Sequence, residues 1–139
     1  MITNSMEKLH EFKKRGLSLL ILKDGQEMFA SSDPMLDPLL RCLQQHRTEM
    51  AGALAIDKIV GSAAAFLLAL AKVNQVITPL ASETAMAILE RHKIAVVAEK
   101  TIPLIKNRDG SDICPMEKLA RQFRSPQSFY RHLLTQRKA

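Results

Sequence analysis

The residue with the clearest chemical potential in this chain is Cys114, which directly precedes Pro115. Proline favours the first position of an α-helix, so Cys114 is predicted to be the N-cap of a short helix. A thiol near the positive end of a helix dipole can have a lowered pKa, which favours the nucleophilic thiolate. A packed, unreactive cysteine is the more common alternative. Cys114 is therefore a candidate nucleophile, with both interpretations open.

The loop before this cysteine is dense in polar side chains. A turn is predicted at Asp109-Gly110, and Asn107, Arg108 and Asp112 lie on either side of it. Such a segment is either an ordinary surface turn or a loop that contacts a ligand. In the second interpretation Asp109 takes part in catalysis, while Asn107, Arg108 and Asp112 bind the substrate.

Two turns that follow predicted buried strands also carry polar side chains. Asp57 and Lys58 come after a strand over 51–56, and Ser82 comes after a strand over 75–79. In open α/β sheets, ligands bind beyond the carboxyl ends of the strands. Asp57 is then a candidate general base, and Lys58 and Ser82 are candidate substrate-binding residues. Asp57 and Ser82 could instead cap the helices that follow them, which is the more frequent role of these residue types.

The sequence offers few metal ligands. The histidines at positions 10, 46, 92 and 132 fall on separate predicted helices without HxxxH spacing, and Cys42 and Cys114 form no CxxC pair. Cys42 lies on the apolar face of a leucine-rich predicted helix, so we expect it in the core. We expect no metal and no cofactor.

The pattern of apolar residues predicts the elements that position these side chains. Strands are predicted over 17–23, 26–31, 51–56, 75–79 and 94–99, with a hairpin turn at Asp24-Gly25 between the first two. Helices are predicted over 4–14, from Asp33-Pro34 to about His46, over 59–73 and from Ser82 to His92, with two more starting at Pro115 and Ser125-Pro126. Because the helix over 59–73 is apolar almost all round, it should be central and covered.

The alternation of strand and helix after residue 50 implies right-handed crossovers between parallel strands. A hairpin leads into this unit, so the predicted sheet is mixed. We therefore expect a three-layer α-β-α sandwich with a mixed five-stranded sheet and helices on both faces.

Length and composition are those of one domain over residues 1–139 with an aliphatic core, since 47% of the residues are hydrophobic and only 4% aromatic. The longest apolar runs fall short of a signal-peptide core and of a membrane span. Two distant cysteines give no disulfide framework, which suits a reducing compartment. We expect a cytoplasmic protein that does not enter a membrane.

The net charge of +6 comes entirely from the last forty residues, because residues 1–99 carry eleven basic and eleven acidic side chains. The basic helical segment over 115–136 could attract an anionic ligand, or its helices could form a homodimer contact. Nucleic-acid binding would use five basic residues: Arg121, Arg124, Arg131, Arg137 and Lys138. No Gly-rich loop, RRM signature or aromatic platform accompanies them, which disfavours this function.

The order of the predicted elements resembles the cytidine-deaminase fold. The segments IDKIVG (56–61), ASETA (81–85) and NRDGSDICPME (107–117) are more specifically similar to an uncharacterised bacterial family, domain of unknown function 1893. This resemblance covers essentially the whole chain. It implies a deaminase-like fold and brings no established activity.

Zinc deaminases carry a signature of H-x-E followed by P-C-x-x-C. In this chain, the segment between the predicted third strand and the next helix is Asp57-Lys58-Ile59. The corresponding segment after the fourth strand is Pro79-Leu80-Ala81-Ser82. Neither contains these ligands. We therefore expect no zinc-activated hydroxide. The leading hypothesis is a zinc-independent domain that binds or transforms a nucleotide-like or other anionic metabolite, with Asp57, Asp109 and Cys114 around one hollow. The alternative is a non-catalytic interaction or homo-oligomerising domain.

Overall fold

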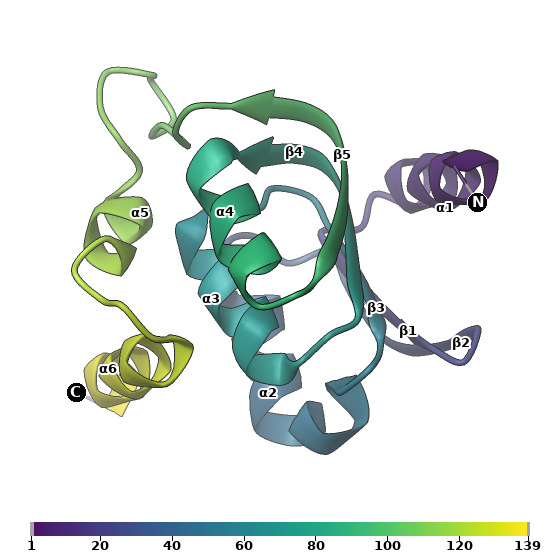
Figure 1. Cartoon of the computed structure of the whole chain (residues 1–139), viewed down its shortest axis with the longest axis horizontal. Helices are drawn as coiled ribbons and strands as arrows, with labels where there is room; N and C mark the ends of the chain where they lie inside the picture. Colours follow the sequence, from purple (N-terminus) through teal and green to yellow (C-terminus); the bar gives the residue numbers. More distant parts are fainter. Residues whose placement is uncertain (1, 139) are drawn as a thin grey trace.

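Five strands form one mixed sheet in the order β2-β1-β3-β4-β5 (Figure 1). The computed structural model describes residues 2–138, and the side chains of residues 4–136. The strands are β1 (Leu19–Lys23), β2 (Gln26–Ser31), β3 (Leu54–Asp57), β4 (Gln75–Ser82) and β5 (Ala95–Ile102). β1 is antiparallel to β2 and β3, whereas β3, β4 and β5 run parallel. The predicted mixed five-stranded sheet is confirmed.

Helices cover both faces of this sheet. They are α1 (Ile2–Lys14), α2 (Asp37–Met50), α3 (Ser62–Ala71), α4 (Glu83–Arg91), α5 (Pro115–Ala120) and α6 (Pro126–Lys138). α1 lies on one face, and α2, α3 and α4 lie on the other (Figure 1). α5 and α6 pack against α3 from the outside. Within residues 2–138, no helix has both the length and the apolarity needed to cross a bilayer.

The alternation of side chains along the strands divides the core in two. Leu20, Ile56 and Ile77 point toward α1, where they meet Leu9 and Phe12. The opposite face of the strands contributes apolar side chains to a larger core built around α3. Every residue of α3 is buried, as expected for a helix that is apolar all round.

Several helix and strand boundaries differ from the sequence prediction. α2 does not begin at Asp33-Pro34, because Met35 has a positive φ of 66° and the N-cap is Leu36. The Asp33 carboxylate instead pairs with the Arg41 guanidinium at 2.9 Å. α2 continues past a kink at His46 to Met50. β4 and β5 extend further than predicted, to Ser82 and Ile102, because they keep pairing with each other on both sides of Pro79.

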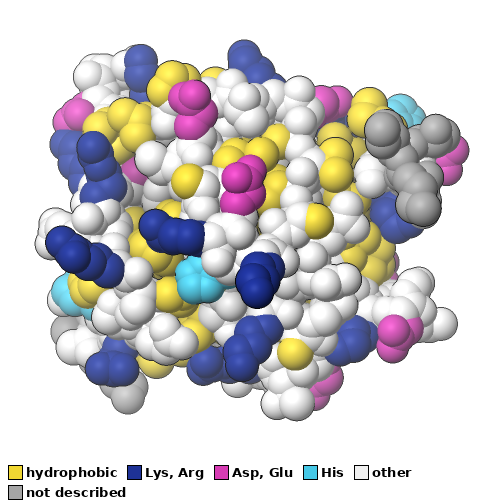
Figure 2. All heavy atoms as spheres, in the orientation of Figure 1, with side chains coloured by type: hydrophobic (Ala, Val, Ile, Leu, Met, Phe, Trp, Pro, Cys, Tyr) yellow, Lys and Arg dark blue, Asp and Glu magenta, His cyan; other side chains and the backbone are white. Residues whose placement is uncertain are grey.

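The C-terminal segment packs against α3. Ser125 caps α6 by accepting a hydrogen bond from the Ser128 N–H at 3.2 Å. Phe129 and Leu133 on α6 are buried against the core around α3. Figure 2 shows the molecule in the orientation of Figure 1, and lysine and arginine side chains gather there over α5 and α6. The side chains of Arg137 and Lys138 lie outside the described residues.

Candidate functional site

Asp57 is the last residue of β3, and strand alternation places its side chain on the same face as the buried Ala55, toward α3. The residue as a whole is partly buried. Burial raises the pKa of Asp57 to about 7, although hydrogen bonds from the backbone amides of Lys58 and Ile59 act in the opposite direction. A carboxyl group with such a pKa exchanges a proton near neutral pH.

The residues after Asp57 are open to solvent and are held in place by Ser18. Lys58 is exposed, and so is Ile59, at 47% of its surface. The Lys58 N–H donates to the Ser18 carbonyl at 3.0 Å. The Ser18 hydroxyl in turn donates to the carbonyl of Asp33. Ser18 therefore joins the turn after β3 to the turn before α2, so that both turns lie at the same edge of the sheet.

Ser82 caps α4, as predicted: its hydroxyl accepts the Ala85 N–H at 3.1 Å. It also lies 3.1 Å from the hydroxyl of Thr84, which accepts the Ser62 hydroxyl at 3.0 Å. Ser82 and Ser62 are both buried. A chain of three hydroxyl groups thus connects the start of α4 with the start of α3.

The start of α3 is capped by a residue that the sequence did not point to, Glu117 of α5. Its carboxylate accepts the Ser62 N–H at 2.6 Å and the Ala63 N–H at 3.1 Å. Only 5% of Glu117 is exposed. The expectation that Asp57 caps this helix is wrong, because the N-cap is Gly61 and makes no side-chain hydrogen bond. The free backbone amides at the positive end of α3 instead donate to Glu117, a residue that is distant in the sequence.

Gly61 allows the Glu117 carboxylate to lie close to the backbone at the start of α3. A Cβ atom at this position would lie 2.5 Å from the carboxyl carbon and both carboxylate oxygens of Glu117. Any larger residue would therefore push α5 away from the start of α3. The small residues from Gly61 to Ala65 allow a close neighbour at the start of α3, but their types do not indicate that this neighbour is Glu117.

The loop between β5 and α5 uses most of its polar side chains within itself. Asn107 accepts the Asp112 N–H at 3.4 Å, and Asp109 accepts the Ser111 N–H at 2.9 Å and its hydroxyl at 2.6 Å. The Ser111 hydroxyl holds the pKa of the Asp109 carboxyl below its usual range. Asp112 pairs with Lys118, which lowers the pKa of Asp112 in the same way.

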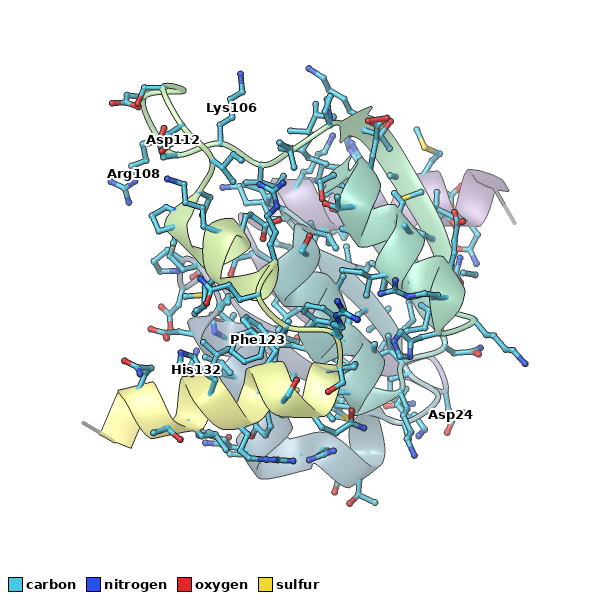
Figure 3. The ribbon with its side chains drawn as sticks, turned by 60° about the vertical axis from the view of Figure 1, so that its left-hand side comes forward. Asp24, Lys106, Arg108, Asp112, Phe123 and His132 are labelled. Atoms are coloured by element: carbon cyan, nitrogen blue, oxygen red, sulfur yellow. The ribbon has the colours of Figure 1, made fainter. Side chains whose placement is uncertain are left out.

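The side chain of Arg108 projects from this loop, away from the sheet (Figure 3), whereas Asp112 is held by Lys118 of α5. Arg108 is exposed. The loop therefore presents a cation to solvent and keeps its carboxylates ionised at neutral pH.

Cys114 is the N-cap of α5, as predicted, and is partly exposed. Its thiol makes no capping hydrogen bond. Its N–H donates to the Ile105 carbonyl at 3.0 Å, and its own carbonyl accepts the Glu117 N–H at 2.9 Å. Cys42 is fully buried, and burial raises the pKa of its thiol to about 11, which confirms it as a core residue.

Comparison with known proteins identifies the family. The family model described as "TM1506: Domain of unknown function (DUF1893)" matches residues 7–136. The chain belongs to this family. It is also similar to a solved structure, a DUF1893 family protein (TM1506) from Thermotoga maritima, with 30% identity and a TM-score of 0.85. That match covers 94% of this chain and 88% of the other. A search of curated proteins finds no match.

Two further structures relate this DUF1893 chain to a wider fold. Two crystal forms of Acinetobacter baumannii RibD, forms 2 and 1, match with TM-scores of 0.51 and 0.52 and 21% identity. Each match covers 91% of this chain but only 38% of RibD. At this identity the likeness shows the fold alone, which is cytidine-deaminase-like, as the sequence predicted.

The donor atoms at the starts of α3 and α4 do not suit zinc, the metal of deaminases with this fold. They are the hydroxyl groups of Ser62, Ser82 and Thr84 and the carboxylate of Glu117. Zinc sites in proteins use cysteine, histidine and carboxylate ligands, and both oxygens of Glu117 already accept backbone amides. Among residues 2–138, no three His, Cys, Asp or Glu side chains are grouped to hold a metal ion.

Two surface hollows are lined by residues other than the three that were predicted to surround one hollow, Asp57, Asp109 and Cys114. One, of about 470 Å³, is lined by Ile102, Pro103, Leu104 and Lys106. The other, of about 250 Å³, lies between α2, α3 and α6. Neither is lined by Asp57, Asp109 or Cys114. Of the predicted site residues, Ser82 is linked through hydroxyl groups to the start of α3, where Glu117 binds.

Proposed function

We propose that this DUF1893 protein binds a small anionic molecule, nucleotide-like or another anionic metabolite, where β3 turns into α3, and that it does so without zinc. Asp57 exchanges a proton with the ligand. The observation that carries this proposal is the position of Asp57, a partly buried acidic residue directly before an exposed cationic and an exposed apolar side chain. Its pKa of about 7 suits a group that gives and takes protons at neutral pH.

The neighbours of Asp57 supply the binding interactions. Lys58 is the partner for the negative charge of the ligand, and Ile59 is an apolar contact for its remaining part. Small-molecule sites typically combine apolar surface with a few polar groups that converge on the ligand. The Ser18 hydrogen bonds hold this turn in place before the ligand arrives.

The segment around α5 forms the other wall of the proposed site. Glu117 fixes α5 to the start of α3, and Cys114 lies three residues earlier, at the solvent-exposed start of the same helix. In this proposal Cys114 and Asp109 act on the ligand, with Asp109 as an ionised acceptor whose pKa is held below its ordinary value by Ser111. Arg108, with Asn107 and Asp112 beside it, provides ligand contacts from the loop, and Ser82 lies at the base of the site.

Thermal-shift measurements against a panel of nucleotides and anionic metabolites test this function. We expect at least one compound to raise the Tm of the wild type, and the shift to be lost in Asp57→Asn and in Lys58→Gln. Cys114→Ser should weaken it. Asp24→Asn is the matched control, since Asp24 lies in the β1–β2 turn, far from the loop that carries Arg108 (Figure 3). Shifts that persist in both Asp57→Asn and Lys58→Gln would show that the ligand does not bind at this edge.

A further inference from the structure

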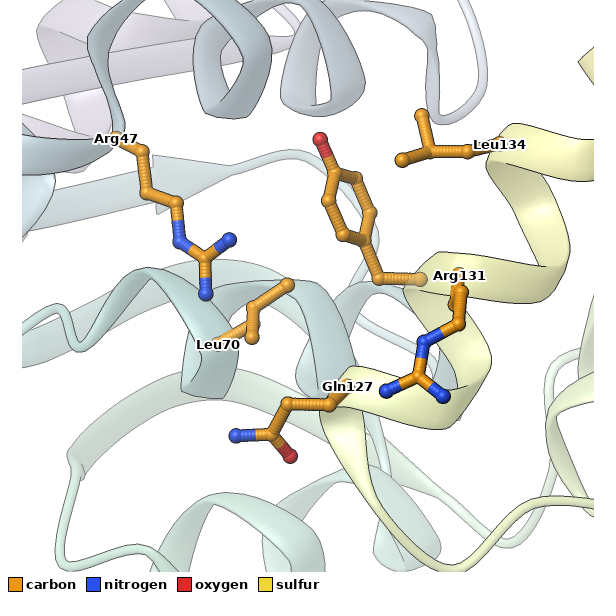
Figure 4. A pocket seen from close by; sticks show the side chains of 6 residues that line it. Arg47, Leu70, Gln127, Arg131 and Leu134 are labelled. Atoms are coloured by element: carbon orange, nitrogen blue, oxygen red, sulfur yellow. The ribbon is translucent and has the colours of Figure 1, made fainter.

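A second candidate site lies in the hollow between α2, α3 and α6 (Figure 4). Its volume is about 250 Å³, and its lining residues are Arg47, Leu70, Gln127, Tyr130, Arg131 and Leu134. Leu70 lies eight residues along α3 from Ser62, about 12 Å at the rise of an α-helix. The hollow is therefore separate from the edge at which Asp57 lies, and an inference about it does not depend on the proposed function.

The spacing of residues on α6 creates this hollow. Gln127, Tyr130, Arg131 and Leu134 follow the helical repeat of three and four residues, so they share one face of the helix. Arg47 reaches into the same space from α2 (Figure 4). Its guanidinium carbon lies 6.0 Å from the centroid of the Tyr130 ring, which is a cation–π contact.

Within the part of the chain whose side chains are described, neither arginine has an acidic partner. Among residues 4–136, the ion pairs of the structure involve other basic side chains, and none includes Arg47 or Arg131. Both residues are exposed, while Leu70 is buried and Tyr130 partly buried. The hollow thus combines an apolar floor with two unneutralised guanidinium groups and the amide of Gln127.

These groups define the chemistry of a ligand. A guanidinium group is a planar fork of donors that matches carboxylate and phosphate oxygens, and it also stacks on aromatic rings. The Tyr130 ring with Leu70 and Leu134 suits a flat apolar group. The volume is below the roughly 300 to 1,000 Å³ of pockets for drug-sized ligands, which limits the ligand to about one ring and its substituent.

We propose that this hollow binds a small ring compound that carries an oxyanion, a carboxylate or a phosphate. Arg47 and Arg131 hold the oxyanion, Gln127 donates a further hydrogen bond to it, and the ring lies against Tyr130. Phosphate and carboxylate share this recognition, because both present planar or near-planar pairs of oxygens to a guanidinium fork.

The chain contains a single tyrosine, so Tyr130 can report on the hollow directly. Protein labelled with 3-fluorotyrosine should give one ¹⁹F NMR resonance. We expect phenyl phosphate, benzoate or both to shift it in a saturable way, whereas their uncharged counterparts, phenol and benzamide, do not. The two anions distinguish a phosphate from a carboxylate preference.

Arg47→Gln and Arg131→Gln should each weaken binding of the active anion by about tenfold or more, as expected for the loss of a charge-assisted hydrogen bond. Arg91→Gln is the matched control, since Arg91 is an exposed residue at the end of α4 and does not line the hollow. It should leave the affinity unchanged.

Three results would overturn the proposal: no shift with either anion, equal shifts with the uncharged compounds, or undiminished binding in the Arg47→Gln/Arg131→Gln double variant. Binding that is lost in Asp57→Asn but kept in both arginine variants would place the anion at the β3 edge, against this inference. Binding that is kept in Asp57→Asn but lost in the arginine variants supports a ligand site in the hollow, even if the function proposed for Asp57 fails.

Discussion

The carboxylate of Glu117 accepts the backbone amide of Ser62 at 2.6 Å, although the two residues are 55 positions apart in the sequence. This contact joins α5 to the buried start of α3. It places an internal carboxylate at the positive end of the most buried helix in the described structure. The position of α5, and with it Cys114 and the preceding loop, therefore depends on Glu117.

Replacing Glu117 should destabilise the protein. Glu117→Ala leaves the Ser62 and Ala63 amides without an acceptor, and we expect it to lower the free energy of unfolding by about 2 to 3 kcal/mol. Glu117→Gln keeps one acceptor oxygen and should cost about half as much. Urea unfolding measures both. Glu83→Gln, in the exposed first turn of α4, is the control and should change stability by less than about 0.5 kcal/mol. Equal effects of Glu117→Ala and the control would contradict this role.

Gly61→Ala should also be destabilising, by about 1 to 3 kcal/mol, because the added methyl group would overlap the Glu117 carboxylate. The φ of −97° at Gly61 is one that alanine adopts readily, so the cost comes from the contact and not from the backbone. A double-mutant cycle with Glu117→Ala separates the two causes. The cost of Gly61→Ala should shrink by about 1 kcal/mol or more once Glu117 is truncated. A strictly additive cycle would show that the two residues do not interact.

Asp57 should make stability depend on pH. Its folded pKa of about 7 lies above the ordinary value of 3.8, so the folded state holds the proton more tightly than the unfolded state. The contribution of Asp57 to stability should therefore be fully present below about pH 4 and should be lost as the pH rises to about 7.

Asp57→Asn removes this dependence. Its stability relative to the wild type should rise between pH 4 and 7 and then level off. A pKa that moves from 3.8 to about 7 corresponds to a change of up to about 4 kcal/mol. Thermal or urea unfolding across this range measures it, with Asp24→Asn as the control. A difference that stays flat with pH would mean that Asp57 titrates at its ordinary pKa.

The two cysteines should differ in reactivity. Cys114 is partly exposed, whereas Cys42 is fully buried with a pKa raised to about 11. In the native protein a thiol reagent should modify one equivalent quickly, and Cys114→Ser should abolish this phase. Cys42 should react only on unfolding. Labelling of both residues at similar rates would show that the start of α5 is packed, or that α2 opens readily.

The sequence predicted the features that depend on near neighbours. Cys114 was predicted as a helix cap, Ser82 was a candidate cap, and a helix start was predicted at Ser125-Pro126. A cap requires only its own residue type and the two or three residues after it. The alternation of apolar residues likewise predicted the mixed sheet and the buried α3. These patterns are local and need no knowledge of distant contacts.

Features that depend on distant contacts could not be predicted in this way. Asp57 has the residue type of a cap and lies just before the helix predicted over 59–73, but α3 begins only at Ser62. Its first amides are bound by Glu117 from another part of the chain. Asp33 was also expected to cap a helix, yet it pairs with Arg41. The hollow at Tyr130 requires α2 and α6 to lie together, which neither helix indicates by itself.

A ¹³C NMR titration of the Asp57 carboxyl carbon, assigned by comparison with Asp57→Asn, bears most directly on the proposed site. A midpoint near pH 7 is the expected result, since it would give the protein a proton donor and acceptor at the turn between β3 and α3. A midpoint near 4, the usual value for aspartate, would mean that Asp57 is permanently ionised at neutral pH and has no role in proton exchange.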